Sequence, residues 1–153
     1  MKGITMKYSP FIMIVLVVGL STAILRASDK EDVIASLNKT IEAFNKHDVD
    51  NYFSTFVSDN TEFPYVVSPL RHDAAMWKHF VEGTTSLAYV NYHQQDSEVQ
   101  IYNEDAAIVT GYYTFSWMEK GGQMNYQSGR ASIVLVKQNG KWMTAHMHFS
   151  KMF

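Results

Sequence analysis

The sequence predicts an α+β fold in which helices come first and a curved antiparallel sheet follows. Two observations support this class. Apolar residues recur at helical spacing in the stretch after residue 27, and the pattern changes to alternation after Gly83. Turn residues then divide the second half into consecutive strands. Such strands curl around the preceding helices and leave a pocket between the two layers.

The first 27 residues differ in composition from the rest. Lys2 and Lys7 precede an uncharged apolar run, residues 11–25, and Arg26 and Ala27 follow it. This layout is typical of a secretory signal peptide. As a helix the run would span about 22 Å, less than the roughly 30 Å of a hydrocarbon core. We therefore expect cleavage after Ala27. The alternative is an uncleaved signal anchor, which would be the chain's contact with a membrane.

Residues 28–153 remain as one domain, expected to be exported and either periplasmic or secreted. The sequence has no cysteine, which excludes a lipid-bearing cysteine and disulfides, so the hydrophobic core must hold the domain together. Loss of residues 1–27 removes three basic residues and no acidic one, which leaves ten basic residues against 15 acidic ones. This balance lacks the basic stripe of a nucleic-acid-binding protein, so no nucleic acid partner is expected.

Three helices are predicted. Ser28 and Glu31 form a capping box for the first helix, which ends near residues 45–47. Asp48 caps a second, shorter helix in which Phe56 points inward, and a third helix covers about residues 72–82 with Gly83 as its stop. The apolar face of the first helix carries Val33, Ile34, Leu37, Ile41 and Phe44.

Five strands are predicted, at residues 61–67, 86–102, 106–118, 125–137 and 141–149. A turn at Asp59-Asn60 precedes the first, and Pro64 makes that strand an edge strand or an irregular one. In the last hairpin a three-residue loop, 138–140, with Gly140 in the left-handed conformation is favoured over a two-residue loop. It pairs Lys137 with Lys141, Ser132 with His146, and Arg130 with His148. One face is then polar (Arg130, Ser132, Trp142, Thr144, His146, His148, Ser150) and the other apolar (Ala131, Ile133, Leu135, Met143, Ala145, Met147, Phe149).

The last two strands carry recognisable motifs: Asn139-Gly140-Lys141-Trp142, then Ala145-His146-Met147-His148-Phe149-Ser150, with Glu104-Asp105-Ala106-Ala107 and Gly129-Arg130 upstream. They resemble the SnoaL-like and nuclear-transport-factor-two-like superfamily. Within it, the likeness is greatest to the association (hub) domain of calcium/calmodulin-dependent protein kinase II. It extends over about residues 31–150. The resemblance implies a cone-shaped sheet wrapped on three helices, a pocket, and a homodimer formed through the sheets.

The resemblance also implies where a ligand would bind. The pocket arginines of the hub domain fall on Tyr113, Ile133 and Phe149 here, so the pocket lacks its anion-binding charges. It would take a small apolar or aromatic ligand. The expected lining is Tyr113, Trp117, Ile133, Met147, Phe149 and Phe56; the alternative is that these side chains only fill the core.

The polar face offers a second candidate site. Arg130, His146 and His148 are interpreted as a hydrogen-bonded cluster at a dimer contact, with an acid–base pair of histidines as the alternative. No metal site is expected, because the histidines have no third ligand at a diagnostic spacing. No cofactor is expected either, since no phosphate-binding glycine loop is present.

Two function classes follow. The first is an exported small-ligand-binding or homo-oligomerisation domain, without catalysis. The second is a cofactor-free isomerase, dehydratase or cyclase, which requires an acid–base pair inside the pocket. Tyr113 and His93 are the best candidates for that pair. The directions of these two side chains discriminate between the two classes, because an enzyme requires both of them to face one void.

Overall fold

The computed structural model describes residues 29–63 and 81–152. The predicted signal peptide, the capping role of Ser28, the effect of Pro64 and most of the predicted third helix lie outside these residues. Residues 81–84 are helical and continue past Gly83, which therefore does not end that helix. In the described part of the chain, no helix is both long and apolar enough to cross a membrane.

The first helix comprises residues 29–45 and ends where the sequence predicts. The second helix, α2, spans Val49–Phe53, and the side chain of Asp48 accepts a hydrogen bond from the Asn51 N–H at its start. The prediction that this helix extends to Phe56 is wrong. Phe56 begins β1 instead, although its side chain is buried as expected.

The five strands form one sheet in the order β1-β5-β4-β3-β2. Their bounds are β1 Phe56–Phe63, β2 Tyr89–Tyr102, β3 Ala106–Met118, β4 Met124–Gln138 and β5 Lys141–Lys151. β1 is an edge strand, as predicted, and pairs with β5 in parallel, whereas the other pairs are antiparallel. The predicted turn at Asp59-Asn60 is wrong, because both residues lie within β1, where its pairing with β5 is irregular.

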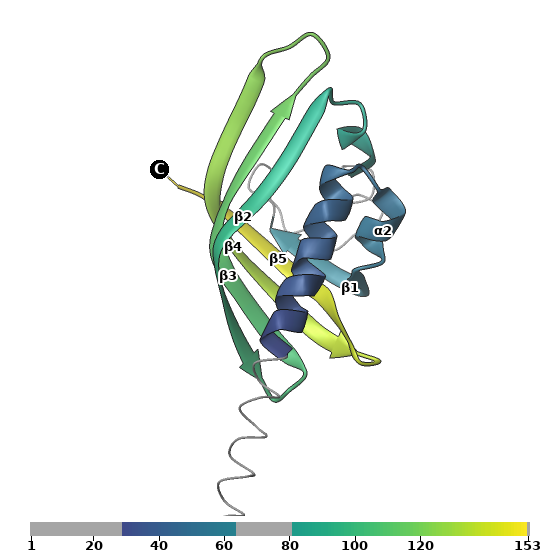
Figure 1. Cartoon of the computed structure of the whole chain (residues 1–153), viewed down its shortest axis with the longest axis vertical. Helices are drawn as coiled ribbons and strands as arrows, with labels where there is room; N and C mark the ends of the chain where they lie inside the picture. The colour runs from purple at the N-terminus through teal and green to yellow at the C-terminus, as the bar shows by residue number, and fades with distance from the viewer. Residues whose placement is uncertain (1–28, 64–80, 153) are drawn as a thin grey trace, which may run out of the picture.

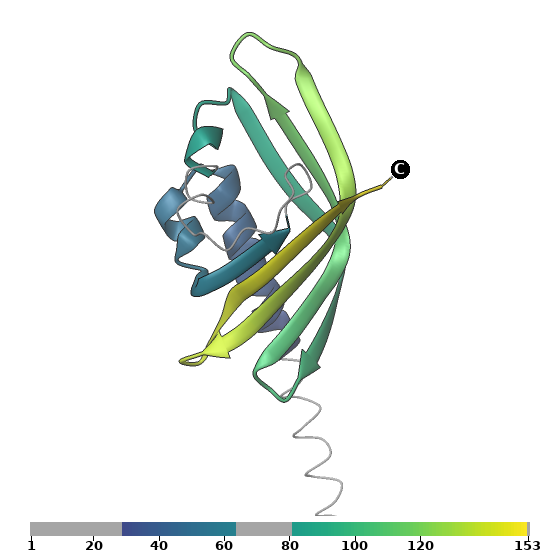
Figure 2. The ribbon, with the colours of Figure 1, turned by 180° about the vertical axis from the view of Figure 1, so that it is seen from behind.

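The helices cover one face of this curved sheet and leave the other open (Figures 1 and 2). We call these the inner face and the outer face. Burial alternates along the strands accordingly: Val109 and Tyr113 on β3 and Ile133 and Leu135 on β4 are buried on the inner face. The fold class is therefore the predicted α+β arrangement of helices and a curved, mostly antiparallel sheet.

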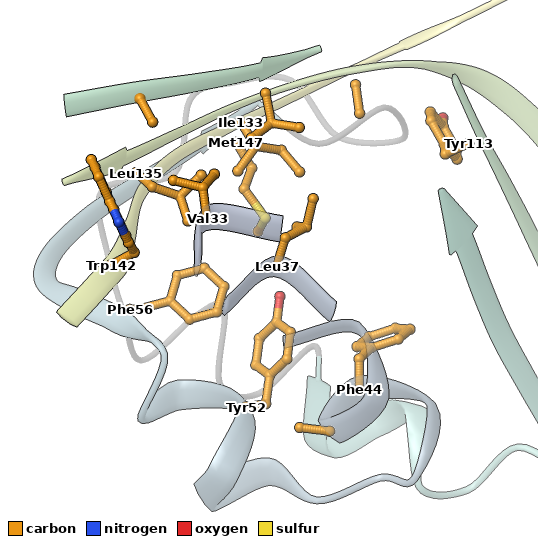
Figure 3. Packing of buried hydrophobic residues seen from close by; sticks show 14 of the residues in the cluster. Val33, Leu37, Phe44, Tyr52, Phe56, Tyr113, Ile133, Leu135, Trp142 and Met147 are labelled. Carbon is orange, nitrogen blue, oxygen red and sulfur yellow. The ribbon is translucent and has the colours of Figure 1, made fainter. Parts of the chain in front are cut away.

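The core lies between the helix of residues 29–45 and the strands β3, β4 and β5 (Figure 3). Val33 and Leu37 of the helix belong to the same buried cluster as Ile133, Leu135 and Met147 of the sheet. Each fully buried Leu or Ile side chain contributes about 1.5–3 kcal/mol by leaving water. The predicted apolar faces of helix and sheet thus meet, and this packing determines which side chains of the sheet lie on the inner face.

The hairpin between β4 and β5 differs from the prediction. Gln138 pairs with Lys141, so the loop has two residues, and Asn139 and Gly140 have φ angles of 52° and 76°. Positive φ at both positions is the turn that Asn-Gly favours. The positive φ of Gly140 is confirmed, whereas the three-residue loop and the pairs derived from it are wrong.

A bulge at Ala145 then returns the following side chains of β5 to the sheet faces on which they were predicted to lie. The register shifts between the pairs Leu135–Thr144 and Val134–His146, which leaves Ala145 as the extra residue. Before the bulge, Trp142 and Thr144 are buried, contrary to their predicted place on the polar face. Beyond it, the order of faces is the predicted one.

Candidate functional site

The outer face carries a cluster of rings and hydroxyl groups where β1 meets β5. The Thr61 hydroxyl and Nδ1 of His146 are 2.7 Å apart, within hydrogen-bond distance. The ring of Phe63 lies with its centroid 5.9 Å from that of His146 and 5.6 Å from that of His148. Burial lowers the pKa of His146, and the neighbouring charge of His148 lowers it further. His146 is therefore held by a hydrogen bond and a ring contact and favours its neutral form, whereas His148 is exposed.

Arg130 lies on this same face. It pairs with Ser150, while Ser132 pairs with His148 and Val134 pairs with His146. Directly paired residues share a face, and so do residues two apart along a strand. The predicted grouping of Arg130, His146 and His148 on one face is thus observed, although the pairs differ from those predicted. Within residues 29–63 and 81–152, Arg130 makes no ion pair.

Large exposed apolar side chains are also concentrated on the outer face. Seven such residues are exposed in the described chain, and the seventh, Met152, follows β5. The register and the alternation of burial place the other six on the outer face: Phe63, Tyr89, Tyr102, Tyr112, Met124 and Tyr126. Tyr126 is 77% exposed. The open face of the sheet is therefore rich in aromatic rings that the described part of the chain leaves exposed.

The inner face also holds a group of aromatic rings on β2, β3 and β5, which joins the core cluster through Tyr113. Tyr113 is stacked on Tyr92 at 5.6 Å between centroids, and Phe149 meets both rings edge-on at 5.4 and 5.9 Å. Gln127 donates a 2.7 Å hydrogen bond to the Tyr113 hydroxyl, and the Tyr92 hydroxyl donates to Gln94. Burial raises the pKa of Tyr92, and so, to a smaller extent, does Tyr113, so the Tyr92 hydroxyl stays neutral. We call Tyr92, Tyr113 and Phe149 the inner aromatic cluster.

The proposed acid–base pair of Tyr113 and His93 is not brought together. Gln94 pairs with Tyr113, whereas His93 pairs with Thr114. His93 therefore points to the outer face, where it is exposed, while Tyr113 is 3% exposed on the inner face. Since the two side chains face opposite sides of the sheet, this pair cannot act on one substrate. The enzyme hypothesis therefore lacks the acid–base pair that it requires.

The remaining predicted lining residues lie on the inner side of the sheet but in different places. Ile133, Met147 and Phe56 belong to the buried core cluster. Trp117 is half-buried and stacks on Phe115, whose ring lies 6.1 Å from that of Phe44. Figure 3 shows Tyr113 set apart from the side chains packed against Val33 and Leu37. Tyr113 belongs to the same core cluster and Phe149 packs against it, and these two predicted lining residues contact each other.

Sequence reasoning missed Glu62, a carboxylate on the inner face that is 4% exposed. It pairs with Met147, and across the sheet the same row continues through Ile133 to Val109. A carboxylate in an apolar row is costly to bury and is therefore a functional candidate. No local signal in the sequence could have found it, because alternation along a strand leaves open whether Glu62 or its neighbours Thr61 and Phe63 face the helices. No three or more His, Asp or Glu residues of the described ranges gather as metal ligands.

Comparison with solved structures places the fold. A candidate association domain of calcium/calmodulin-dependent protein kinase II from Xanthomonas campestris superposes with a TM-score of 0.69 at 22% identity, covering 78% of this chain and 85% of that one. The association domain of the Caenorhabditis elegans kinase gives a TM-score of 0.69 at 20% identity, covering 82% and 97%. A candidate scytalone dehydratase from Novosphingobium aromaticivorans gives 0.78 at 13% identity, covering 86% and 89%.

These structures share the fold and differ in what their names say they do, so the fold alone does not assign an activity. No curated protein sequence matches the chain. The family model for the calcium/calmodulin-dependent protein kinase II association domain, however, matches residues 29–153, which include every helix and strand described above. The chain belongs to the calcium/calmodulin-dependent protein kinase II association domain family.

Proposed function

We propose that this domain associates with itself, as a homodimer, through the outer face of its sheet. The observation that carries the proposal is the gathering of six exposed large apolar side chains on that one face. Three of them, Tyr89, Met124 and Tyr126, lie together around Met118 at one end of the sheet, and a contiguous apolar patch of this kind marks an interaction site. Membership of a family named for association supports the same reading.

The chemistry of the outer face suits a protein interface. Tyrosine, methionine and arginine are enriched at interfaces, and a stable one buries about 1,200–2,000 Å² in total. Burying apolar surface favours the dimer, and this gain must exceed the cost of the translational and rotational freedom that two copies lose on association. The half-buried Ile108 and Val134 lie side by side near the middle of the face, as cross-strand partners. They would form the apolar centre, with Arg130, His146 and His148 beside them.

Val134→Lys tests this proposal, because it places a charge at the apolar centre without touching the inner face. We expect the wild-type domain, residues 28–153, to sediment as a dimer at micromolar concentration and the variant to sediment as a monomer with a similar melting temperature. Ala35→Lys, at an exposed position of the first helix, is the matched control and should stay dimeric. A monomeric wild type, or a dimeric Val134→Lys variant, would refute the proposal.

We also propose that the protein is exported and that its mature chain begins near Ser28. The basic start, the apolar run and the small residues before Ser28 support this. The intact mass of the exported protein measures the cleavage site directly. A membrane-bound form that still begins at Met1 would instead indicate a signal anchor.

A second candidate function is the binding of a small, uncharged aromatic molecule at the inner aromatic cluster. The favouring observation is the pairing of the Tyr113 hydroxyl with Gln127 beside three rings, which offers polar groups and a stacking surface together. Native mass spectrometry of the purified domain reports the oligomer mass and any retained small molecule at once. A ligand that is retained by wild type and lost from Tyr113→Phe would support this function. The same ligand retained by both would place it elsewhere.

A further inference from the structure

The outer face is organised in rows that cross the sheet, and these rows limit how two copies can meet. One row contains Glu98, Thr110, Ser132 and His148, one residue from each of β2, β3, β4 and β5. Its acidic end lies on β2 and its basic end on β5. Arg130 adds a further basic group on β4.

Two copies that meet through the same face are related by a two-fold axis lying between the sheets. If this axis runs across the strands, each strand lies over itself. The basic groups of β4 and β5 then face the same groups of the partner. If the axis runs along the strands between β3 and β4, β3 lies over β4 of the partner and β2 lies over its β5. Opposite ends of each row then meet.

The central rows complement themselves only in the second arrangement. Glu98 lies against the partner's His148, opposite in charge when the imidazole is protonated. In the next row Tyr112, paired with Arg130 within its own chain, lies against the partner's Arg130, where ring and guanidinium attract each other. In the row on the other side Ile108 lies against the partner's Val134, apolar on apolar. In the aligned class of sheet packing the strands stay within about 30° of each other, which would preserve this matching near the centre.

We propose that the two copies pack with their two-fold axis along the strands, between β3 and β4, so that Glu98 of each contacts the partner's His148. The proposal rests on the self-association proposed above. The occupant of the face is a second copy, selected by the complementarity of the rows. Such matching mainly sets the orientation of the contact, since charge pairs contribute more to specificity than to affinity.

Glu98 and His148 make a clean test because they are distant within one chain. Their strands, β2 and β5, are separated by three strand spacings of about 4.8 Å each, which is about 14 Å. Strong coupling between the two residues must therefore come through the partner. The variants are Glu98→Lys, His148→Glu and the double variant that exchanges the charges. We expect each single variant to weaken dimerisation about tenfold, because Glu98→Lys removes the carboxylate that faces the imidazole and His148→Glu places two carboxylates together, in two contacts per dimer. The double variant should recover most of the wild-type affinity.

Sedimentation equilibrium gives the dissociation constants, and melting temperatures show that each monomer is folded. Glu31→Lys, exposed on the helix that covers the inner face, is the control and should bind as wild type does. If Val134→Lys abolishes the dimer but the double variant is as weak as the single ones, this arrangement is wrong while self-association through the outer face stands. If the wild type is monomeric, the underlying proposal itself fails.

Discussion

Gly129 is the point where a ring and a neighbouring strand both approach the backbone of β4. A Cβ atom at this position would lie 2.6 Å from a ring carbon of Tyr113 and closer still to the backbone oxygen of Ser150. The ring can shift, but the backbone oxygen belongs to the β4–β5 ladder. Glycine therefore allows Tyr113 to lie flat on the inner face, within reach of Gln127.

Gly129→Ala should consequently destabilise the domain by about 1–3 kcal/mol, the usual cost of overpacking. Chemical denaturation measures this change. Gly122→Ala is the control, because a Cβ there would meet only Glu119, at 3.4 Å or more. Equal stabilities for the two variants would show that the contact at Gly129 relaxes without cost.

Single residues differ in how far the sequence could place them. The positive φ of Gly140 was predictable, because Asn-Gly favours that conformation locally. The burial of Glu62 was not, since its neighbours on both sides could equally have faced the helices. The separation of His93 from Tyr113 depends on a pairing offset of one residue between two distant strands, which no local pattern in the sequence contains.

At the scale of elements, one side chain of the first helix, Asn45, bonds to the backbone of the edge strand β2. The Asn45 amide accepts a 2.7 Å hydrogen bond from the Tyr92 N–H and donates a 2.9 Å bond to the Tyr92 carbonyl. β2 is an edge strand, so these two backbone groups have no strand partner. Asn45 thus satisfies the edge as another strand would, and it protects this point of β2 against pairing with a foreign strand.

Asn45→Ala should cost about 1–3 kcal/mol in unfolding free energy, because it leaves two backbone groups unpaired at a part-buried position. Hydrogen exchange at the Tyr92 amide should accelerate in the same variant. Asn45→Asp keeps the acceptor but loses the donor, so its Tyr92 amide should remain more protected than in Asn45→Ala. Unchanged exchange in both variants would mean that the two hydrogen bonds of Asn45 do not hold β2 in solution.

The elements themselves were largely predictable, and the exceptions have physical causes. The alternation and β-branched composition of residues 106–118 gave the bounds of β3 as observed. The prediction placed the end of α2 too late, at Phe56, because Phe53 and Phe56 are three residues apart, which is the spacing of a helix face. Both side chains point inward whether Phe56 belongs to a helix or to a strand. The bulge at Ala145 could not be predicted, because nothing in the local sequence distinguishes the extra residue from its neighbours.

For the whole molecule, the essential arrangement is one sheet with two different faces. The inner face could be predicted from the sequence, since the apolar side chains of the helix and of β4 had to meet. The outer face was only partly predicted. Arg130, His146 and His148 were assigned to it, but the tyrosines of β2, β3 and β4 were not, because aromatic residues are normally counted toward the core. Only the register shows that they share one open surface.

A pair of substitutions tests whether the two faces act independently. Arg130→Ala removes a charged group from the outer face and should shift the dimer toward monomer at micromolar concentration while the melting temperature stays close to that of wild type.

Phe149→Ala removes a half-buried ring from the inner aromatic cluster and should lower stability by about 2 kcal/mol, below the 3–5 kcal/mol of a fully buried ring. It should leave the dimer intact, because Ala131, the pairing partner of Phe149, is buried on the inner face. Analytical ultracentrifugation and melting curves on both variants measure the two effects. An Arg130→Ala variant that stays dimeric but loses a bound small molecule would invert the assignment and make the outer face the ligand site.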